Sequence, residues 1–237
     1  MRLRGLLFDK DGTLLDYHAT WMPLNRAVTL FAADGDEHLA QRLLVHNGYD
    51  PVTGRIRANT PLAAGTPDEI AESFAQMLGG PVRGDLGAEV DRLFRSGAAA
   101  SVLVPDAVAA IAQFRRRASY LGIATSDSKA GLEASLAHHG ILPQFDFVAA
   151  YDSGHGLKPG PGMALAFCAA CDIEPAQMCV VGDNQHDLDM GRSAGAGLVV
   201  GVLTGTSTPA DFEGHADKVY PGLAEMAADE EFMELLA

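Results

Sequence analysis

Basic residues are scarce in this sequence. Its 17 lysines and arginines stand against 31 aspartates and glutamates, which gives a formal net charge of −14 at pH 7. A protein of that charge repels a phosphate backbone, so we expect no nucleic-acid partner. No apolar run is long enough to span a membrane, and Asp9 and Asp11 interrupt the N-terminal apolar stretch before it reaches signal-peptide length. We therefore expect a cytoplasmic protein with no membrane partner.

Cysteine is also rare, with 3 residues in a chain of 237. Cys168 and Cys171 lie at helical spacing, and Cys179 opens an apolar run. A C-x-x-C pair can bind a metal or act in redox chemistry, but neither a second pair nor a histidine cluster accompanies this one. We expect reduced thiols buried in the core. The chain has no internal repeat, and its length allows one large domain or a domain with a smaller insertion.

Short apolar runs alternate with helical patterns in the second half of the chain, which is typical of a parallel sheet with crossover helices. The predicted strands are residues 3–8, 120–124, 145–150, 178–182, 198–203 and 218–220. Residues 17–99 instead predict four amphipathic helices and no convincing strand. We therefore predict an α/β fold with a doubly wound parallel sheet, formed by residues 1–16 and 100–237, and a helical cap domain of residues 17–99 inserted after the first strand.

Two groups of acidic residues follow predicted strands. Asp9 and Asp11 come after the first strand and are followed by a turn at Gly12. An open α/β sheet binds its ligand at this end of its strands. A calcium loop would need a glutamate about twelve residues further on, which is missing, whereas a simple turn stays possible. Asp183 and Asp187 are four residues apart at a predicted helix start, so both can face one cation, although Asp183 could instead cap that helix.

These groups belong to a set of four motifs in order. The run Asp9-Lys10-Asp11-Gly12-Thr13 resembles the first motif of the haloacid dehalogenase superfamily of phosphatases. Thr125, at the end of a predicted strand, resembles the hydroxyl of the second motif, and Lys158 in Gly156-Leu157-Lys158-Pro159 resembles the third. The run Gly182-Asp183-Asn184-Gln185-His186-Asp187 resembles the fourth. The resemblance covers nearly the whole chain. Within the superfamily, the chain resembles phosphoglycolate phosphatases with a helical C1-type cap.

The resemblance implies a phosphatase that works through an aspartyl-phosphate. Asp9 would be the nucleophile, and Asp11 would protonate the leaving oxygen and then deprotonate the hydrolytic water. Lys158 would shield the substrate's charge, and Thr125 would bind a phosphoryl oxygen with help from the backbone N–H of Ser126. The side chain of Ser126 is the competing assignment for that role.

The same resemblance implies Mg²⁺ as the cofactor. Its ligands would be the Asp9 carboxylate, the backbone carbonyl of Asp11, and one or both of Asp183 and Asp187. The expected substrate is a small phosphorylated metabolite, with phosphoglycolate first and sugar phosphates next. A phosphomutase, a phosphoryl-accepting signalling domain and a silent binding module remain alternatives, whereas dehalogenation is disfavoured by Asp11. The sequence leaves the oligomeric state open.

The cap contributes one candidate substrate-binding segment, residues 53–60. Arg55 and Arg57 lie there between Gly54 and Pro61, in a stretch with no helical periodicity. Such a loop is costly to order unless it contacts something, and arginine pairs well with a carboxylate or a second phosphate, so we expect this segment to determine substrate selectivity. Two ordinary surface arginines are the alternative.

Other polar residues near the motifs receive weaker expectations. By strand alternation Lys10 should point away from the site, and Asp127 should be a turn residue. His18, His155 and His186 lie close to the motifs in sequence. We expect structural roles for these histidines and leave a substrate contact open.

Overall fold

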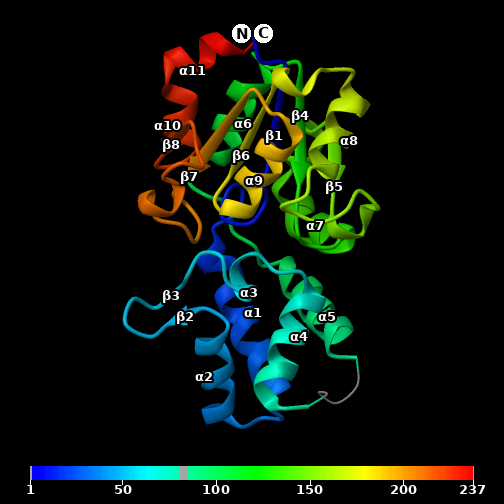
Figure 1. Ribbon diagram of the computed structural model, residues 1–237, viewed down its shortest axis with the longest axis vertical. Helices are drawn as coiled ribbons and strands as arrows, with labels where there is room; N and C mark the ends of the chain where they lie inside the picture. Colours follow the sequence, from blue (N-terminus) through cyan, green and yellow to red (C-terminus); the bar gives the residue numbers. More distant parts are fainter. Residues whose placement is uncertain (1, 81–84, 237) are drawn as a thin grey trace.

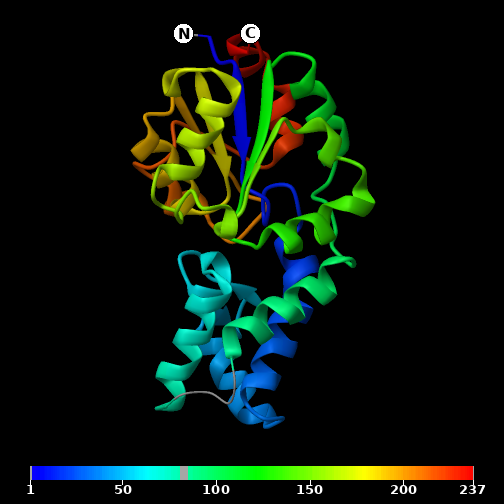
Figure 2. The same cartoon turned by 90° about the vertical axis from the view of Figure 1, so that its right-hand side faces the viewer.

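The computed structural model describes residues 2–80 and 85–236, and it consists of two parts stacked end to end (Figure 1). One part is a sheet with helices on both faces, and the other is a group of helices beyond one end of that sheet (Figure 2). Both chain termini lie at the end of the molecule remote from the helical part (Figure 1). Residues 81–84 of the predicted cap lie outside the described residues.

The sheet of the first part is parallel throughout, with the strand order β5-β4-β1-β6-β7-β8. This confirms the predicted doubly wound α/β fold. The strands are β1 (Gly5–Phe8), β4 (Tyr120–Ala124), β5 (Phe147–Ala149), β6 (Met178–Gly182), β7 (Leu198–Val202) and β8 (Lys218–Tyr220). Three predicted strands were one to three residues too long, because residues outside the ladder, several of them apolar, flank the paired segments. Leu3, for example, forms an isolated bridge with Leu236.

Helices cover both faces of this sheet. One face carries α6 (Ala107–Arg115), α7 (Lys129–Leu136), α10 (Leu223–Ala228) and α11 (Glu230–Leu235), and the other carries α8 (Gly162–Cys171) and α9 (Gln185–Ala194). In β1, Leu6 and Phe8 pack against the helices of the first face, and Leu7 packs against the helices of the second face. Successive side chains of a strand point to opposite faces of the sheet. Burial on both faces explains why the strands are continuous apolar runs. The three cysteines are free and buried, as expected.

The cap has its own hydrophobic cluster, which includes Val28, Leu43 and Phe74. Its helices are α1 (Tyr17–Ala32), α2 (Glu37–His46), α3 (Pro61–Ala64), α4 (Pro67–Leu78) and α5 (Leu86–Ala98). The four longer ones match the four predicted helices, whereas α3 is a single additional turn. At the start of α4, Thr66 and Glu69 form a reciprocal capping box. No helix within the described ranges is both long enough and apolar enough to cross a membrane.

The expectation of a strand-free cap was wrong. A short antiparallel hairpin pairs β2 (Tyr49–Asp50) with β3 (Arg55–Ile56). Strands of two residues show no alternation in sequence, so periodicity could not predict them. The loop around Arg55 and Arg57 is held by its own backbone, because Gly54 N donates to Asp50 O at 2.8 Å and Arg57 N donates to Gly48 O at 2.9 Å.

Two chain segments connect the cap to the sheet, and they pair with each other. Asp16 N donates to Val102 O at 2.8 Å, and Val104 N donates to Leu14 O at 3.0 Å. Leu15 and Leu103 form an antiparallel bridge between these contacts. The cap therefore joins the core through one paired connection, directly before α1 begins.

Candidate active site

Three neighbouring strands end in polar residues at one edge of the sheet. Asp9 follows β1, and its N–H donates to Val181 O at 2.8 Å. Thr125 follows β4, and its N–H donates to Ala149 O at 2.9 Å. Asp183 follows β6 directly. Because β4, β1 and β6 are adjacent and parallel, these residues meet at the centre of the sheet's carboxyl edge, which faces the cap (Figure 2).

Three buried carboxylates form a cluster at this edge. Carboxylate oxygens of Asp9, Asp183 and Asp187 lie within 4.8 Å of one another. Two such charges about 4 Å apart repel by roughly 4 kcal/mol at an effective dielectric constant of about 20. Burial, reinforced by the charge of Asp187, raises the pKa of Asp9 to about 6. Burial and the neighbouring carboxylates also raise the pKa of Asp183 well above its ordinary value. A site made of crowded oxygen donors fits a hard divalent cation such as Mg²⁺.

Lys158 reaches this cluster from the segment before α8. Its Nζ lies 2.7 Å from Asp9 Oδ1 and 2.6 Å from Asp187 Oδ1. Burial favours the neutral amine, but the two carboxylates outweigh it and raise the pKa of Lys158. A charged ammonium group is therefore fixed beside Asp9, where the sequence predicted it.

Asp183 is held in place by residues that sequence reasoning missed. Its Oδ2 accepts hydrogen bonds from Thr206 N at 2.8 Å and from Thr206 Oγ1 at 3.3 Å. Gly12 packs against it with φ +90°, and a Cβ at this glycine would lie 2.5 Å from Asp183 Cγ. The N-cap of α9 is Asn184, so the alternative role of Asp183 as a helix cap was wrong. No motif-like pattern in the sequence singles out Thr206.

The expectation for Lys10 was also wrong. Its side chain is fully buried and lies 2.8 Å from Asp11 Oδ1 and 2.9 Å from Asp127 Oδ2. Strand alternation fails here because β1 ends at Phe8 and the chain bends at Lys10. Asp127 is correspondingly a buried ion-pair partner instead of a simple turn residue. Asp11 and Asp127, which both line the cavity, thus share the buried ammonium group of Lys10.

A cap residue completes the surroundings of Asp11. Trp21 Nε1 donates to Asp11 Oδ1 at 2.6 Å, and Lys10 Nζ lies 4.8 Å from the centre of the indole ring. Tyr17, Trp21 and Asn25 line the same cavity, which their spacing of four residues along α1 permits. This spacing of four residues is the sequence signal by which a functional face of α1 could have been predicted. Burial raises the pKa of Asp11, with Lys10 acting against it.

The remaining predicted residues are distributed around the site. Thr125 and Ser126 both line the cavity, and Thr125 Oγ1 accepts from Asp127 N at 3.1 Å, so the choice between the two hydroxyls stays open. His186 lines the cavity, and burial lowers its pKa. His155 is exposed, and His18 Nε2 is buried with no hydrogen-bond partner among the described residues.

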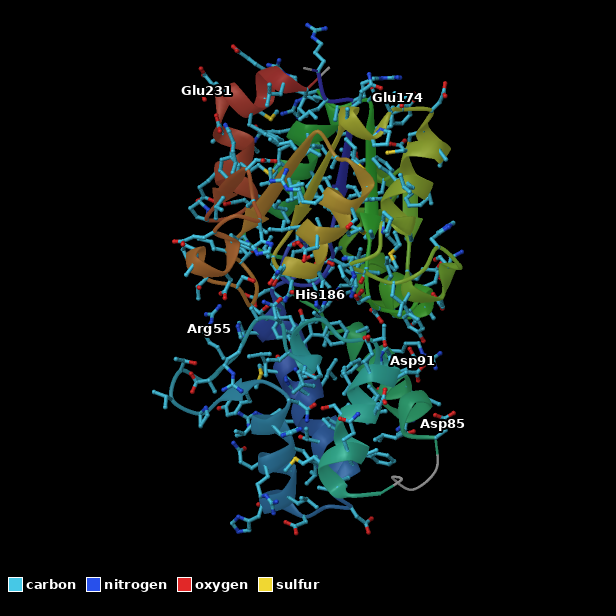
Figure 3. The ribbon with its side chains drawn as sticks, viewed as in Figure 1. Arg55, Asp85, Asp91, Glu174, His186 and Glu231 are labelled. Atoms are coloured by element: carbon cyan, nitrogen blue, oxygen red, sulfur yellow. The ribbon has the colours of Figure 1, made fainter. Side chains whose placement is uncertain are left out.

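The cavity lies between core and cap, is partly open, and has about 630 Å³ of empty space when the adjoining solvent is included. Of the residues that the structure describes, neither Arg55 nor Arg57 lines it. Arg55 Nη2 donates to the core carbonyl of Gly205 at 3.0 Å. Figure 3 labels Arg55 on the cap and His186 on the core, where the two parts meet. Arg57 Nη2 donates to Val45 O within the cap at 3.5 Å.

Comparison with known proteins agrees with this arrangement. Residues 3–195 match the model of the haloacid dehalogenase-like hydrolase family, so the chain belongs to that family. It is 26% identical to N-acetylmuramic acid 6-phosphate phosphatase of Pseudomonas aeruginosa, over 91% of this chain and 88% of that protein. Identity to phosphoglycolate phosphatase of Rhodobacter capsulatus is 24%, over 93% and 96% of the two chains. A hydrolase from Pseudomonas syringae shares the fold with a TM-score of 0.72 at 18% identity, covering 99% of this chain and 100% of that one.

Family and relatives together define the chemistry at a coarse level. The chain is a haloacid dehalogenase-type phosphatase, a hydrolase of phosphoric monoesters.

Proposed function

We propose that this protein hydrolyses a small phosphate monoester with Mg²⁺, through an aspartyl-phosphate formed on Asp9. The observation that carries the proposal is the position of Asp9, which is itself buried, within the cavity between core and cap. It lies 2.7 Å from the Lys158 ammonium group and beside two further carboxylates, with Asp11 and Thr125 on the same cavity wall. This arrangement offers a nucleophile, a charge shield and a proton donor around one reacting group.

In the first half-reaction, a carboxylate oxygen of Asp9 attacks phosphorus, and the bond from phosphorus to the ester oxygen breaks. Asp11 gives its proton to that leaving oxygen. Asp11 Oδ1 already accepts hydrogen bonds from Lys10 and Trp21, so the proton should be held and transferred at Oδ2. Burial of Asp11 favours the protonated acid that this step requires.

In the second half-reaction, a water molecule attacks phosphorus and gives a proton to Asp11. The bond between phosphorus and Asp9 breaks, which releases inorganic phosphate and restores both carboxyl groups. Lys158 can hold Asp9 in the same orientation through both steps, because its second contact, to Asp187, fixes the ammonium group. Thr125 and Ser126 supply hydrogen-bond donors for the phosphoryl oxygens.

The metal ligands in this proposal are Asp9, Asp183 and Asp187, with the backbone carbonyl of Asp11 as the family resemblance implies. The three carboxylates fit the ion because they are crowded, buried and composed of oxygen donors alone. A bound Mg²⁺ would supply the positive charge that lets a carboxylate approach a phosphate dianion.

The decisive experiment compares the wild-type protein with Asp9→Asn. The substitution keeps the shape of the side chain but removes the nucleophile, so kcat should fall by at least about 10³ for every phosphate monoester in a panel with phosphoglycolate and sugar phosphates. Beryllofluoride should bind at Asp9 only in the wild type. Activity within tenfold of wild type in the variant, with a native circular dichroism spectrum, would refute the assignment.

Two alternatives use the same residues. A phosphomutase needs both Asp9 and Asp11, and a signalling domain would stop at the aspartyl-phosphate. The contact of Trp21 with Asp11 favours turnover over signalling, because a positioned acid serves leaving-group protonation and hydrolysis. Accumulation of a bisphosphate intermediate during turnover would instead identify a mutase.

A further inference from the structure

The cap wall of the cavity is apolar. Trp21, Leu62, Pro67, Ile70 and Phe94 face the catalytic edge from four cap helices. The rings of Trp21 and Phe94 meet edge to face with centroids 5.0 Å apart. Such a wall buries an apolar surface favourably, and its residues within the described part of the cap carry no charge for an ionic partner.

The polar groups on this wall already have partners. The hydroxyl of Tyr17 donates to Leu62 O and accepts from Asn25 Nδ2 at 3.2 Å. Burial raises the pKa of Tyr17, which keeps the phenol neutral. Lys158 is the sole lysine or arginine among the described residues that line the cavity, and it already contacts two carboxylates.

Among the described residues on the core side, the two lysines beside the cavity, Lys10 and Lys158, already pair with carboxylates and are not free to bind a second anion. Five carboxylates lie together, from Asp9, Asp11, Asp127, Asp183 and Asp187, and face Lys10 and Lys158. A divalent cation and the transferred phosphoryl dianion would cancel each other. A further carboxylate or phosphate on the substrate would therefore be buried without a partner, which costs several kcal/mol.

We propose that the substrate is a phosphate monoester of an uncharged alcohol, which places an apolar or aromatic surface against Trp21, Ile70 and Phe94. This inference rests on the proposed phosphatase function and narrows its substrate class. It disfavours phosphoglycolate, whose carboxylate would meet the apolar wall, and it disfavours a bisphosphate intermediate for the same reason.

Binding can be measured without turnover. The sequence contains 1 tryptophan, Trp21, and it lines the cavity, so its fluorescence reports ligand binding. In Asp9→Asn with Mg²⁺, we expect benzyl phosphate to bind at least about 10-fold more tightly than 4-carboxybenzyl phosphate, which matches it except for the charge. Equal binding, or tighter binding of the carboxylated ligand, would overturn the proposal.

The wild-type enzyme separates this inference from the phosphatase function. Hydrolysis of both esters with the same kcat/KM would sustain the phosphatase and overturn the neutral substrate class. Failure to hydrolyse any ester would refute the phosphatase function. The ratio of the two dissociation constants in Asp9→Asn would still show whether the cavity prefers an uncharged ligand.

A charge placed on the wall provides the matched test. Ala64 lines the cavity and is half-buried, so Ala64→Lys adds a cation there, and Ala64→Met adds similar bulk without charge. We expect Ala64→Lys to shift the ratio of the two dissociation constants toward the carboxylated ligand by about 10-fold or more, and Ala64→Met to leave it unchanged. Ala63→Lys replaces it if Ala64→Lys does not fold. An unchanged ratio in a folded lysine variant would show that the substrate does not contact this wall.

Discussion

Trp21 Nε1 lies 2.6 Å from Asp11 Oδ1, so a side chain of the cap donates a hydrogen bond to the carboxyl group that we assign as acid and base. Lys10 donates to the same oxygen at 2.8 Å. The two donors leave Oδ2 as the oxygen that can exchange a proton with the substrate. The cap thus contributes to the orientation of the proton donor as well as to the wall of the cavity.

Replacing Trp21 by phenylalanine should slow the hydrolysis of alkyl phosphates. The ring and much of its contact with Phe94 remain, but the donor to Asp11 is lost, and a hydrogen bond to a charged group is worth about 1.5–3 kcal/mol. We expect kcat for an alkyl phosphate to fall about 10- to 100-fold. An aryl phosphate with a good leaving group, such as 4-nitrophenyl phosphate, needs little protonation and should lose far less. Equal losses on both substrates would argue against a role in positioning Asp11.

Lys10→Met should destabilise the fold. Lys10 is fully buried between Asp11 and Asp127, and removal of one partner from a buried ion pair costs about 3–5 kcal/mol. Urea unfolding should show this loss, and adding Asp127→Asn to the same variant should recover part of it, since one unpaired charge disappears. The exposed Lys129 provides the control, and Lys129→Met should leave stability within about 0.5 kcal/mol.

Asp183→Asn should raise the stability of the metal-free protein and weaken its stabilisation by Mg²⁺. Without metal, this substitution removes one of three crowded charges, so thermal unfolding should occur at a higher temperature than in the wild type. In the wild type, Mg²⁺ at about 100 times its Kd should stabilise by about 2.7 kcal/mol. That gain corresponds to roughly 5–10 °C in Tm for a chain of this size. The variant should lose most of it. An equal Mg²⁺ response in both proteins would place the ion elsewhere.

The substrate-binding role expected for Arg55 and Arg57 stays a prediction, and Arg55 has a second possible role. Its bond to Gly205 O connects cap and core, so we expect Arg55→Ala to raise KM by a similar factor for neutral and anionic substrates. Arg57→Ala is the matched control, because Arg57 is exposed and contacts the cap backbone. A loss of about 10-fold or more confined to anionic substrates would instead support direct binding of the substrate.

Much of the core site could be predicted because its chemistry depends on local sequence. Asp9 and Asp183 directly follow buried apolar strands, and topology rules place the ends of parallel strands at one edge. The strands themselves were predicted because both faces of the sheet are covered, which makes each strand a continuous apolar run.

The missed features depend on contacts between distant segments. Thr206 meets Asp183 through a loop that follows β7, and nothing in the local sequence encodes that approach. Lys10 was misjudged because alternation describes a strand and stops where the strand ends. Trp21 lies ten residues from Asp11, but their contact depends on the direction in which α1 leaves the core, which the tertiary packing of the cap determines.

If the cap moves against the core, the paired connection between them is the natural pivot. Leu15 and Leu103 bridge the two segments there, and α1 begins two residues after Leu15. With a rise of about 1.5 Å per residue, Trp21 lies roughly 7 Å along the helix from Asp16. A rotation of about 10° at the pivot would displace the indole by only about 1 Å, whereas the remote end of the cap would swing several times farther. Trp21 lies close to this pivot, so a rotation would displace its contact with Asp11 less than contacts at the remote end of the cap.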